Sequence, residues 1–86
     1  MDETLHIASL VVLARPELFE AVKANLRLLE NLELHQESAA GKLVVVLETR
    51  HEEQILQRIE QINNLPGVLN AALIYHEVLD SAGDLQ

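Results

Sequence analysis

The chain has 86 residues, which is enough for one domain with a single modest hydrophobic core and too few for two domains. It contains no Cys, so disulfides, zinc–thiolate sites and iron–sulfur ligands are excluded. Fourteen acidic and six basic residues give a formal net charge of −8, which repels nucleic-acid backbones and anionic lipid surfaces and favours a cationic partner, although the same charge would also serve solubility alone.

The first apolar run, from Ile7 to Ala14, could imitate the hydrophobic part of a signal peptide. However, Asp2 and Glu3 stand where a signal peptide carries positive charge, and the run is too short to span a bilayer. We therefore expect a soluble, cytoplasmic protein that does not insert into a membrane.

The first two predicted elements are a strand over Leu5–Ala14 and a helix over about Pro16–Glu30. Pro suits the first helical position because its missing N–H would have been unpaired there. Apolar residues then recur at helical spacing and predict a buried stripe. The stripe consists of Phe19, Val22, Leu26 and Leu29.

A second strand is predicted where Leu32 and Leu34 alternate with Glu33 and His35, a pattern typical of a strand with one wet face. Small residues at 38–41 make a tight connection to the third strand, Gly41–Glu48. Residues 43–47 of this strand are all apolar, so an extended backbone points apolar side chains to both faces. This composition is typical of a central strand.

The second predicted helix begins at Thr49, with Glu52 at the spacing of a capping box, so that loss of Thr49 should cost ~1 kcal/mol. Its buried stripe is Ile55, Ile59 and Ile62, and the segment 63–67, which contains Pro66 and Gly67, ends it. A fourth strand follows over Val68–Val78. We expect one domain over residues 1–79 and a flexible tail over 80–86.

A shift of 33 residues superposes the apolar residues of the first strand and helix on those of the third strand and second helix. Two similar strand–helix halves are therefore implied. Right-handed crossovers then predict an α+β fold of the ferredoxin-like split βαβ type (βαββαβ). Its four-stranded antiparallel sheet has the first and third strands in the centre and two helices on one face.

The other face of such a sheet is bare, and the repeat predicts its residues, because equivalent positions should point the same way. If Leu10 and Val12 face the helices, Leu43, Val45 and Leu47 do so too. An exposed apolar sheet of this kind usually marks a dimer interface or a docking site. The bare face is then predicted to consist of Ile7, Ser9, Val11, Leu13, Glu33, His35, Glu37, Val44, Val46, Glu48, Asn70, Ala72, Ile74 and His76.

Catalytic and cofactor chemistries find little support. Ser9 lacks the Gly-x-Ser-x-Gly turn of a nucleophile, and the three Gly are not clustered into a phosphate loop. Phe19 and Tyr75 are the only aromatic residues apart from His, too few for a base-stacking surface. The sequence therefore predicts a protein that is not an enzyme, binds no nucleic acid and carries no cofactor.

Histidines offer two further alternatives. His6 and His76 become neighbours if the first and fourth strands pair, with Glu77 near, but a third ligand on one face is not shown, so no metal site is predicted. Acid–base chemistry by Glu48 with His35 or His76 is weaker still.

Three segments together resemble the NapD family, the cytoplasmic chaperones of the periplasmic nitrate reductase. They are Ser9-Leu10-Val11-Val12, Gly41-Lys42-Leu43-Val44-Val45-Val46-Leu47-Glu48, and Leu65-Pro66-Gly67-Val68-Leu69 followed by Ile74-Tyr75-His76. The likeness covers Ile7 to His76 with the same element order. It implies a binding protein that holds the twin-arginine signal peptide of the catalytic subunit, NapA, and delays Tat export until the molybdenum cofactor is loaded.

The bare face offers a physical basis for that implied role. Carboxylates can bind the Arg-Arg pair of such a peptide, and the apolar centre can cover its apolar segment, as an added strand or as a helix across the sheet. Our candidate peptide-binding residues are Ile7, Ser9, Val11, Glu33, Glu37, Val44, Val46, Glu48, Ile74 and His76. We expect a monomer or a weak homo-oligomer.

Two other functions stay open from the sequence. ACT-like regulatory domains share this fold and bind small molecules, but they favour a Gly-containing loop where this chain has Ala14-Arg15-Pro16. A purely structural homo-oligomer could also bury the bare sheet on itself.

Overall fold

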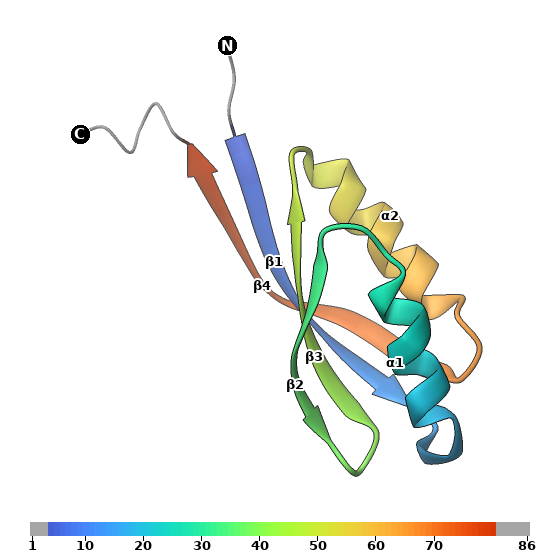
Figure 1. The fold of residues 1–86 in the computed structure, drawn as a ribbon. Helices are drawn as coiled ribbons and strands as arrows, with labels where there is room; N and C mark the ends of the chain where they lie inside the picture. The colour runs from blue at the N-terminus through green and yellow to red at the C-terminus, as the bar shows by residue number, and fades with distance from the viewer. Residues whose placement is uncertain (1–3, 81–86) are drawn as a thin grey trace.

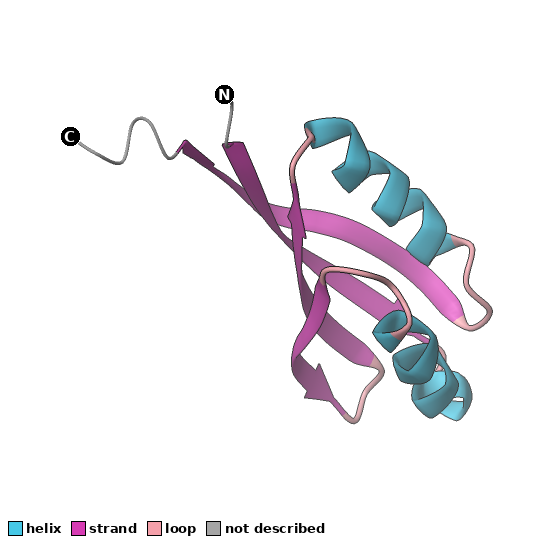
Figure 2. Ribbon diagram, turned by 45° about the horizontal axis from the view of Figure 1, so that its top comes forward, coloured by secondary structure: helices cyan, strands magenta, loops and turns pink. Residues whose placement is uncertain are grey.

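The computed structural model describes residues 4–80 and shows a four-stranded antiparallel sheet with both helices on one face (Figures 1 and 2). The predicted ferredoxin-like fold is confirmed: the strand order is β2-β3-β1-β4, with β1 and β3 in the centre. The elements in chain order are β1 (Thr4–Ala14), the 3₁₀ turn η1 (Pro16–Leu18), α1 (Phe19–Arg27), β2 (Leu32–Ser38), β3 (Lys42–Thr49), α2 (Glu52–Asn63) and β4 (Val68–Asp80).

Strands β1 and β4 continue past the rest of the sheet as a two-stranded ribbon (Figure 1). Pairing of Thr4 with Asp80 and of Leu5 with Leu79 extends β4 two residues beyond its predicted end at Val78. Cross-strand pairing thus overrides the weak strand signal at this end of the sequence. The tail predicted for 80–86 lies, apart from Asp80, outside the described residues.

The core lies between the sheet and the helices. Leu43, Val45 and Leu47 of β3 are fully buried and face the helices, as the repeat predicts, and so are Leu10 and Val12 of β1. The helices contribute fully or almost fully buried side chains of the predicted stripes to the same core. These are Val22, Leu26, Ile55 and Ile62.

The first helix is shorter than predicted because the chain reverses at Asn31. It begins as a 3₁₀ turn at Pro16, and α1 ends at Arg27 instead of Glu30. Asn31 has φ 60°, a left-handed conformation that Asn tolerates better than most residues, and its carbonyl accepts the N–H of Glu48 at 3.0 Å. The helix ends early because this turn must attach to β3.

The predicted capping box at the start of α2 is wrong. Thr49 is the buried last residue of β3, paired with His6, and its hydroxyl donates to the carbonyl of His51 at 3.0 Å. His51 is the N-cap residue, and α2 begins at Glu52. Sheet pairing holds Thr49 in an extended strand, two residues too early to cap the helix. The end of α2 at Asn63 is as predicted, and Gly67, with φ 91°, makes the turn into β4.

Both edge strands contain β-bulges that local sequence does not predict. In β2 the register with β3 shifts between Leu34 and Gln36, and in β4 the register with β1 shifts between Leu73 and Tyr75 and again between Val68 and Asn70. The first two shifts each insert one extra residue, His35 in β2 and Ile74 in β4. Beyond the extra residue, each side chain therefore points to the face opposite to the one that it would face in an unbroken strand.

The bulge in β2 turns Glu37 toward α1, where it forms an ion pair with Lys23. The Lys23 Nζ lies 3.2 and 3.1 Å from the two carboxylate oxygens, 3.3 Å from Glu20, and 5.2 Å from the centre of the Phe19 ring. The hydrogen bond to Glu37 raises the pKa of Lys23 above its ordinary value of 10.5, outweighing burial, which lowers it. This contact attaches the edge strand to the helical layer.

Val44 and Val45 are adjacent residues of one type on opposite faces of β3. Val45→Ala should lower the free energy of unfolding by about 2 kcal/mol, because it removes buried methyl groups and leaves a cavity. Val44→Ala should cost about 1 kcal/mol or less, because its side chain is only half-buried on the open side. Urea denaturation measures both, and equal costs would contradict the assignment of faces.

The Lys23–Glu37 ion pair should make stability depend on pH in the alkaline range. Because the pKa of Lys23 is raised, the stabilisation is fully present below pH 10.5 and is lost as the pH rises through the folded-state value. Lys23→Met should therefore be less stable than the parent protein at pH 8, with a difference that shrinks towards pH 11.

Urea denaturation at a series of pH values measures that difference. Lys42→Met removes the same charge from an exposed lysine of β3 and serves as the control. A difference for Lys23→Met that is constant from pH 8 to pH 11 would contradict this account.

Candidate functional site

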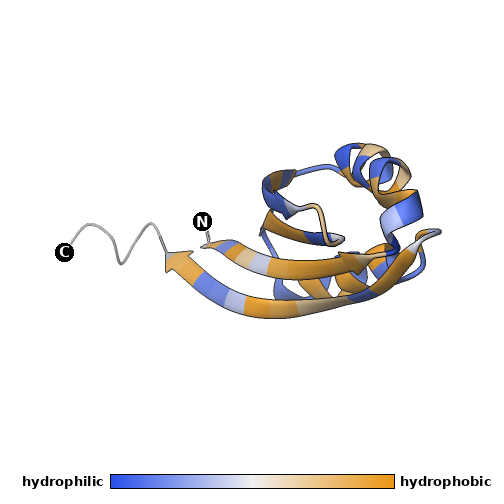
Figure 3. Ribbon diagram, turned by 90° about the horizontal axis from the view of Figure 1, so that it is seen from below, coloured by the Kyte–Doolittle hydropathy of each residue, from blue (hydrophilic) through white to orange (hydrophobic). Residues whose placement is uncertain are grey.

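The face of the sheet opposite the helices, which we call the open face, is the candidate site. In Figure 2 the helices cover only one side of the sheet, and in Figure 3 much of the length of the strands consists of hydrophobic residues. The side chains of Ile7, Val11, Val44 and Val46 on this face are half-buried, in contrast to their fully buried neighbours on the other face. A continuous apolar surface of this kind is typical of a binding site.

The register of the strands arranges the open face in rows that run across the sheet. Residues directly opposite one another in neighbouring strands point to the same face. The four rows, each written in the order in which the strands lie, are Glu48–Ile7–Glu77, Glu33–Val46–Ser9–Tyr75, Gln36–Val44–Val11–Ala72 and Ser38–Lys42–Leu13–Asn70.

Seven of the ten candidate binding residues lie together on the open face. All of those on the central strands are there, because β1 and β3 alternate without interruption over this stretch. The seven residues are Ile7, Ser9, Val11, Glu33, Val44, Val46 and Glu48.

The other three candidates do not lie on this face as predicted, and the bulges are the reason. Glu37 is opposite Leu43 on the helix side and binds Lys23. His76 is opposite the buried Ala8, also on the helix side. Ile74 is the extra residue of the β4 bulge, as His35 is in β2, and neither belongs to a row of the open face.

The prediction missed five residues of the open face: Gln36, Ser38, Lys42, Tyr75 and Glu77. Tyr75 and Glu77 occupy the places predicted for Ile74 and His76. The Tyr75 hydroxyl donates to the Glu77 carboxylate at 3.3 Å, and Tyr75 is 54% exposed. Tyr75 and Glu77 are two residues apart, so the sequence predicts that they share a face of β4. Which face they share depends on the bulge at Ile74, which no local sequence pattern marks.

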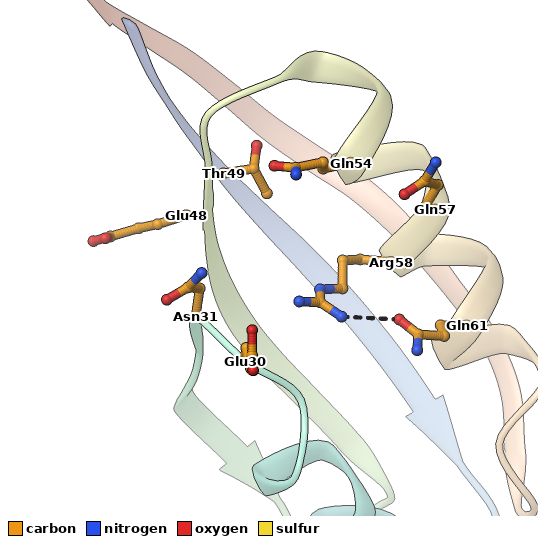
Figure 4. A pocket seen from close by; sticks show the side chains of 8 residues that line it. All are labelled: Glu30, Asn31, Glu48, Thr49, Gln54, Gln57, Arg58 and Gln61. Atoms are coloured by element: carbon orange, nitrogen blue, oxygen red, sulfur yellow. Dashed lines mark hydrogen bonds between the residues drawn. The ribbon is translucent and has the colours of Figure 1, made fainter. Parts of the chain in front are cut away.

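A hollow of about 300 Å³ lies at the start of β2, between the carboxylates of Glu33 and Glu48. Asn31, Leu32 and Val46 complete its lining, so that the apolar Val46 lies beside charged groups. Glu48 projects to the side of β3 away from α2 (Figure 4). Such a site suits a cation with an apolar stem, such as an Arg side chain.

A second hollow, of about 190 Å³, lies between the end of β3 and α2 and is lined almost entirely by polar side chains (Figure 4). Within it, Arg58 donates to the Gln61 side-chain oxygen at 3.0 Å. It meets the first hollow at Asn31 and Glu48, which line both. Glu48 therefore lies at the junction of the open face and this polar cleft.

The predicted neighbours His6 and His76 are in contact on the helix side of the ribbon. His6 Nδ1 and His76 Nε2 are 3.0 Å apart, and the ring centres are 5.2 Å apart. Within residues 4–80 no group of three His, Asp or Glu side chains is placed to hold a metal ion. Nor does any helix in that range have the length and apolar character needed to cross a membrane.

Comparison with known proteins adds independent information. A family model described as NapD protein matches residues 5–80. Chaperone NapD of Escherichia coli (strain K12) is 33% identical over 78 residues, which cover 90% of each chain. Chaperone NapD of Haemophilus influenzae is 30% identical over 73 residues, covering 84% of this chain and 78% of that protein.

Among solved structures, the solution structure of the E. coli Tat proofreading chaperone protein NapD superposes with a TM-score of 0.77 at 34% identity. The match covers 85% of this chain and 78% of the E. coli chain. The likeness therefore extends over most of the chain rather than a single motif.

Proposed function

The chain belongs to the NapD family, and we propose that it binds the twin-arginine signal peptide of NapA, the catalytic subunit of the periplasmic nitrate reductase, on its open face. The relatives are chaperones, so this chain is a chaperone rather than an enzyme. In the proposed role it acts in the cytoplasm and delays Tat export of NapA until the molybdenum cofactor is inserted.

The observation that carries the proposal is the combination of apolar and acidic groups on the open face. Its centre is formed by Val44 and Val46 of β3 with Ile7 and Val11 of β1, and carboxylates stand beside this centre. A twin-arginine signal peptide presents the matching groups, a pair of guanidinium groups followed by an apolar segment. Burial of the apolar segment would supply affinity, and the carboxylates would select the Arg pair.

The hollow between Glu33 and Glu48 is the best place for one of the two Arg side chains. A guanidinium there would reach both carboxylates, while its methylene stem would pack on Val46. Charge-assisted hydrogen bonds of this kind are about twice as strong as neutral ones. The net charge of −8 adds long-range attraction for a cationic peptide.

The related solved structure supports the same role, because it is that of a Tat proofreading chaperone. We expect the free protein to be a monomer or a weak homo-oligomer, since copies that each carry a net charge of −8 repel one another.

A signal peptide carrying Arg-Arg should bind the purified protein with a micromolar or lower dissociation constant at low salt. The same peptide with Lys-Lys should bind about tenfold more weakly, because Lys cannot make bidentate contacts with a carboxylate. Isothermal titration calorimetry measures both constants. Failure of both peptides to bind at micromolar concentration would refute the proposed function.

Glu48→Gln and Glu33→Gln should each weaken binding of the Arg-Arg peptide about fivefold to tenfold, because each removes one charge-assisted contact. Each should also flatten the dependence of affinity on salt.

Glu60→Gln, on the exposed surface of α2, is the matched control, because it removes the same charge from the opposite layer. Titrations at two or more salt concentrations measure both effects. Affinity and salt slope that stay unchanged in both open-face variants would remove these carboxylates from the binding site.

A further inference from the structure

The two ends of the open face carry charges of opposite sign. The first two rows contain the carboxylates of Glu48, Glu77 and Glu33 and lie at the end from which the β1–β4 ribbon extends. In the other two rows, Lys42 is the one charged residue among the described positions, and it lies beside the β2–β3 connection. We call these the ribbon end and the hairpin end.

Glu77 extends the acidic end across the full width of the central sheet. It is opposite Ile7, which is itself opposite Glu48, so the two carboxylates stand on strands that flank β1. At the usual spacing of strands their backbones are about 10 Å apart. The Tyr75 hydroxyl, 3.3 Å from the Glu77 carboxylate, holds this side chain over the open face.

The apolar part of the open face lies between these two ends. Ile7 and Leu13 on β1 mark its limits, and six residues of strand span about 20 Å. About 13 residues of helix would cover the same length. The surface thus suits a guest whose cationic group is at one end of an apolar segment.

We infer that the charges fix the direction of the guest: the Arg pair lies at the ribbon end, and the peptide runs parallel to β1, from Ile7 towards Leu13. This inference rests on the proposed function and specifies how that site is used. Lys42 acts as the repulsive group that disfavours the reverse placement, in which guanidinium groups would approach an ammonium group. If the guest is helical, its C-terminal carbonyls also face Lys42, which the helix dipole favours.

Paramagnetic labelling of the peptide in complex with the intact protein tests the direction. The probe is a signal peptide with Arg-Arg before a 13-residue apolar segment, acetylated and amidated at its ends, with a nitroxide on a Cys beside the Arg pair. The protein has no Cys, so the label stays on the peptide. Amide signals of Ile7, Glu48 and Glu77 should be lost, and those of Leu13, Lys42 and Asn70 retained. A nitroxide at the far end of the segment should give the opposite pattern.

A charge variant provides an independent check. Lys42→Glu makes both ends acidic, so the label beside the Arg pair should then reduce signals at both ends. Arg27→Glu, at an exposed position of α1, makes the same change in net charge and should leave the parent pattern intact.

Glu77→Gln should weaken binding about threefold in calorimetry, through the loss of one charge-assisted contact. Unchanged affinity in that variant would show that Glu77 does not contact the Arg pair.

The outcomes separate the two proposals. Binding with signal loss strongest at Lys42, or with equal loss at both ends of the parent protein, overturns the inferred direction and leaves the proposed function standing. Absence of any binding and of any signal loss overturns both.

Discussion

Burial of one face of the two central strands is the constraint on which the rest of the structure depends. Leu43, Val45 and Leu47 are removed from water by the helices, together with the matching residues of β1. Because side chains in a strand alternate, burying this set necessarily turns Val44 and Val46 to the other side. The helices thus create the core and, by the same geometry, leave a second apolar surface uncovered. In the proposed function, that surface receives the guest peptide.

The bulges at His35 in β2 and at Ile74 in β4 decide what surrounds this surface. Without the bulge in β2, Glu37 would stand on the open face; with it, the carboxylate binds Lys23 and attaches the edge strand to α1. Without the bulge in β4, His76 would take the place that Glu77 occupies. Bulges of this kind redirect side chains at sheet edges without changing the number of strands. Here the bulge in β2 removes the carboxylate of Glu37 from the open face, and the bulge in β4 places the carboxylate of Glu77 on it.

Affinity and selectivity would come from different parts of the open face. Apolar contact is not directional, so Val44 and Val46 can accept many apolar segments. A guanidinium between carboxylates is directional, and Glu33 and Glu48 flank one hollow where it fits. A chaperone for one class of signal peptide needs both properties. It must tolerate variation in the apolar segment while it requires the Arg pair.

Local sequence was sufficient for the order of the elements, the fold and the facing of β1 and β3, because uninterrupted alternation and a 33-residue repeat leave one consistent packing. It was insufficient at Thr49, which pairs in the sheet instead of capping a helix, and at Asn31, where a left-handed residue ends α1 early. The facing of Glu37, His76, Tyr75 and Glu77 was decided only in the folded sheet. Bulges form where an edge strand must follow the twist and hydrogen bonding of the neighbouring strand. Because this constraint comes from another strand, the sequence around the bulge carries no pattern that predicts it.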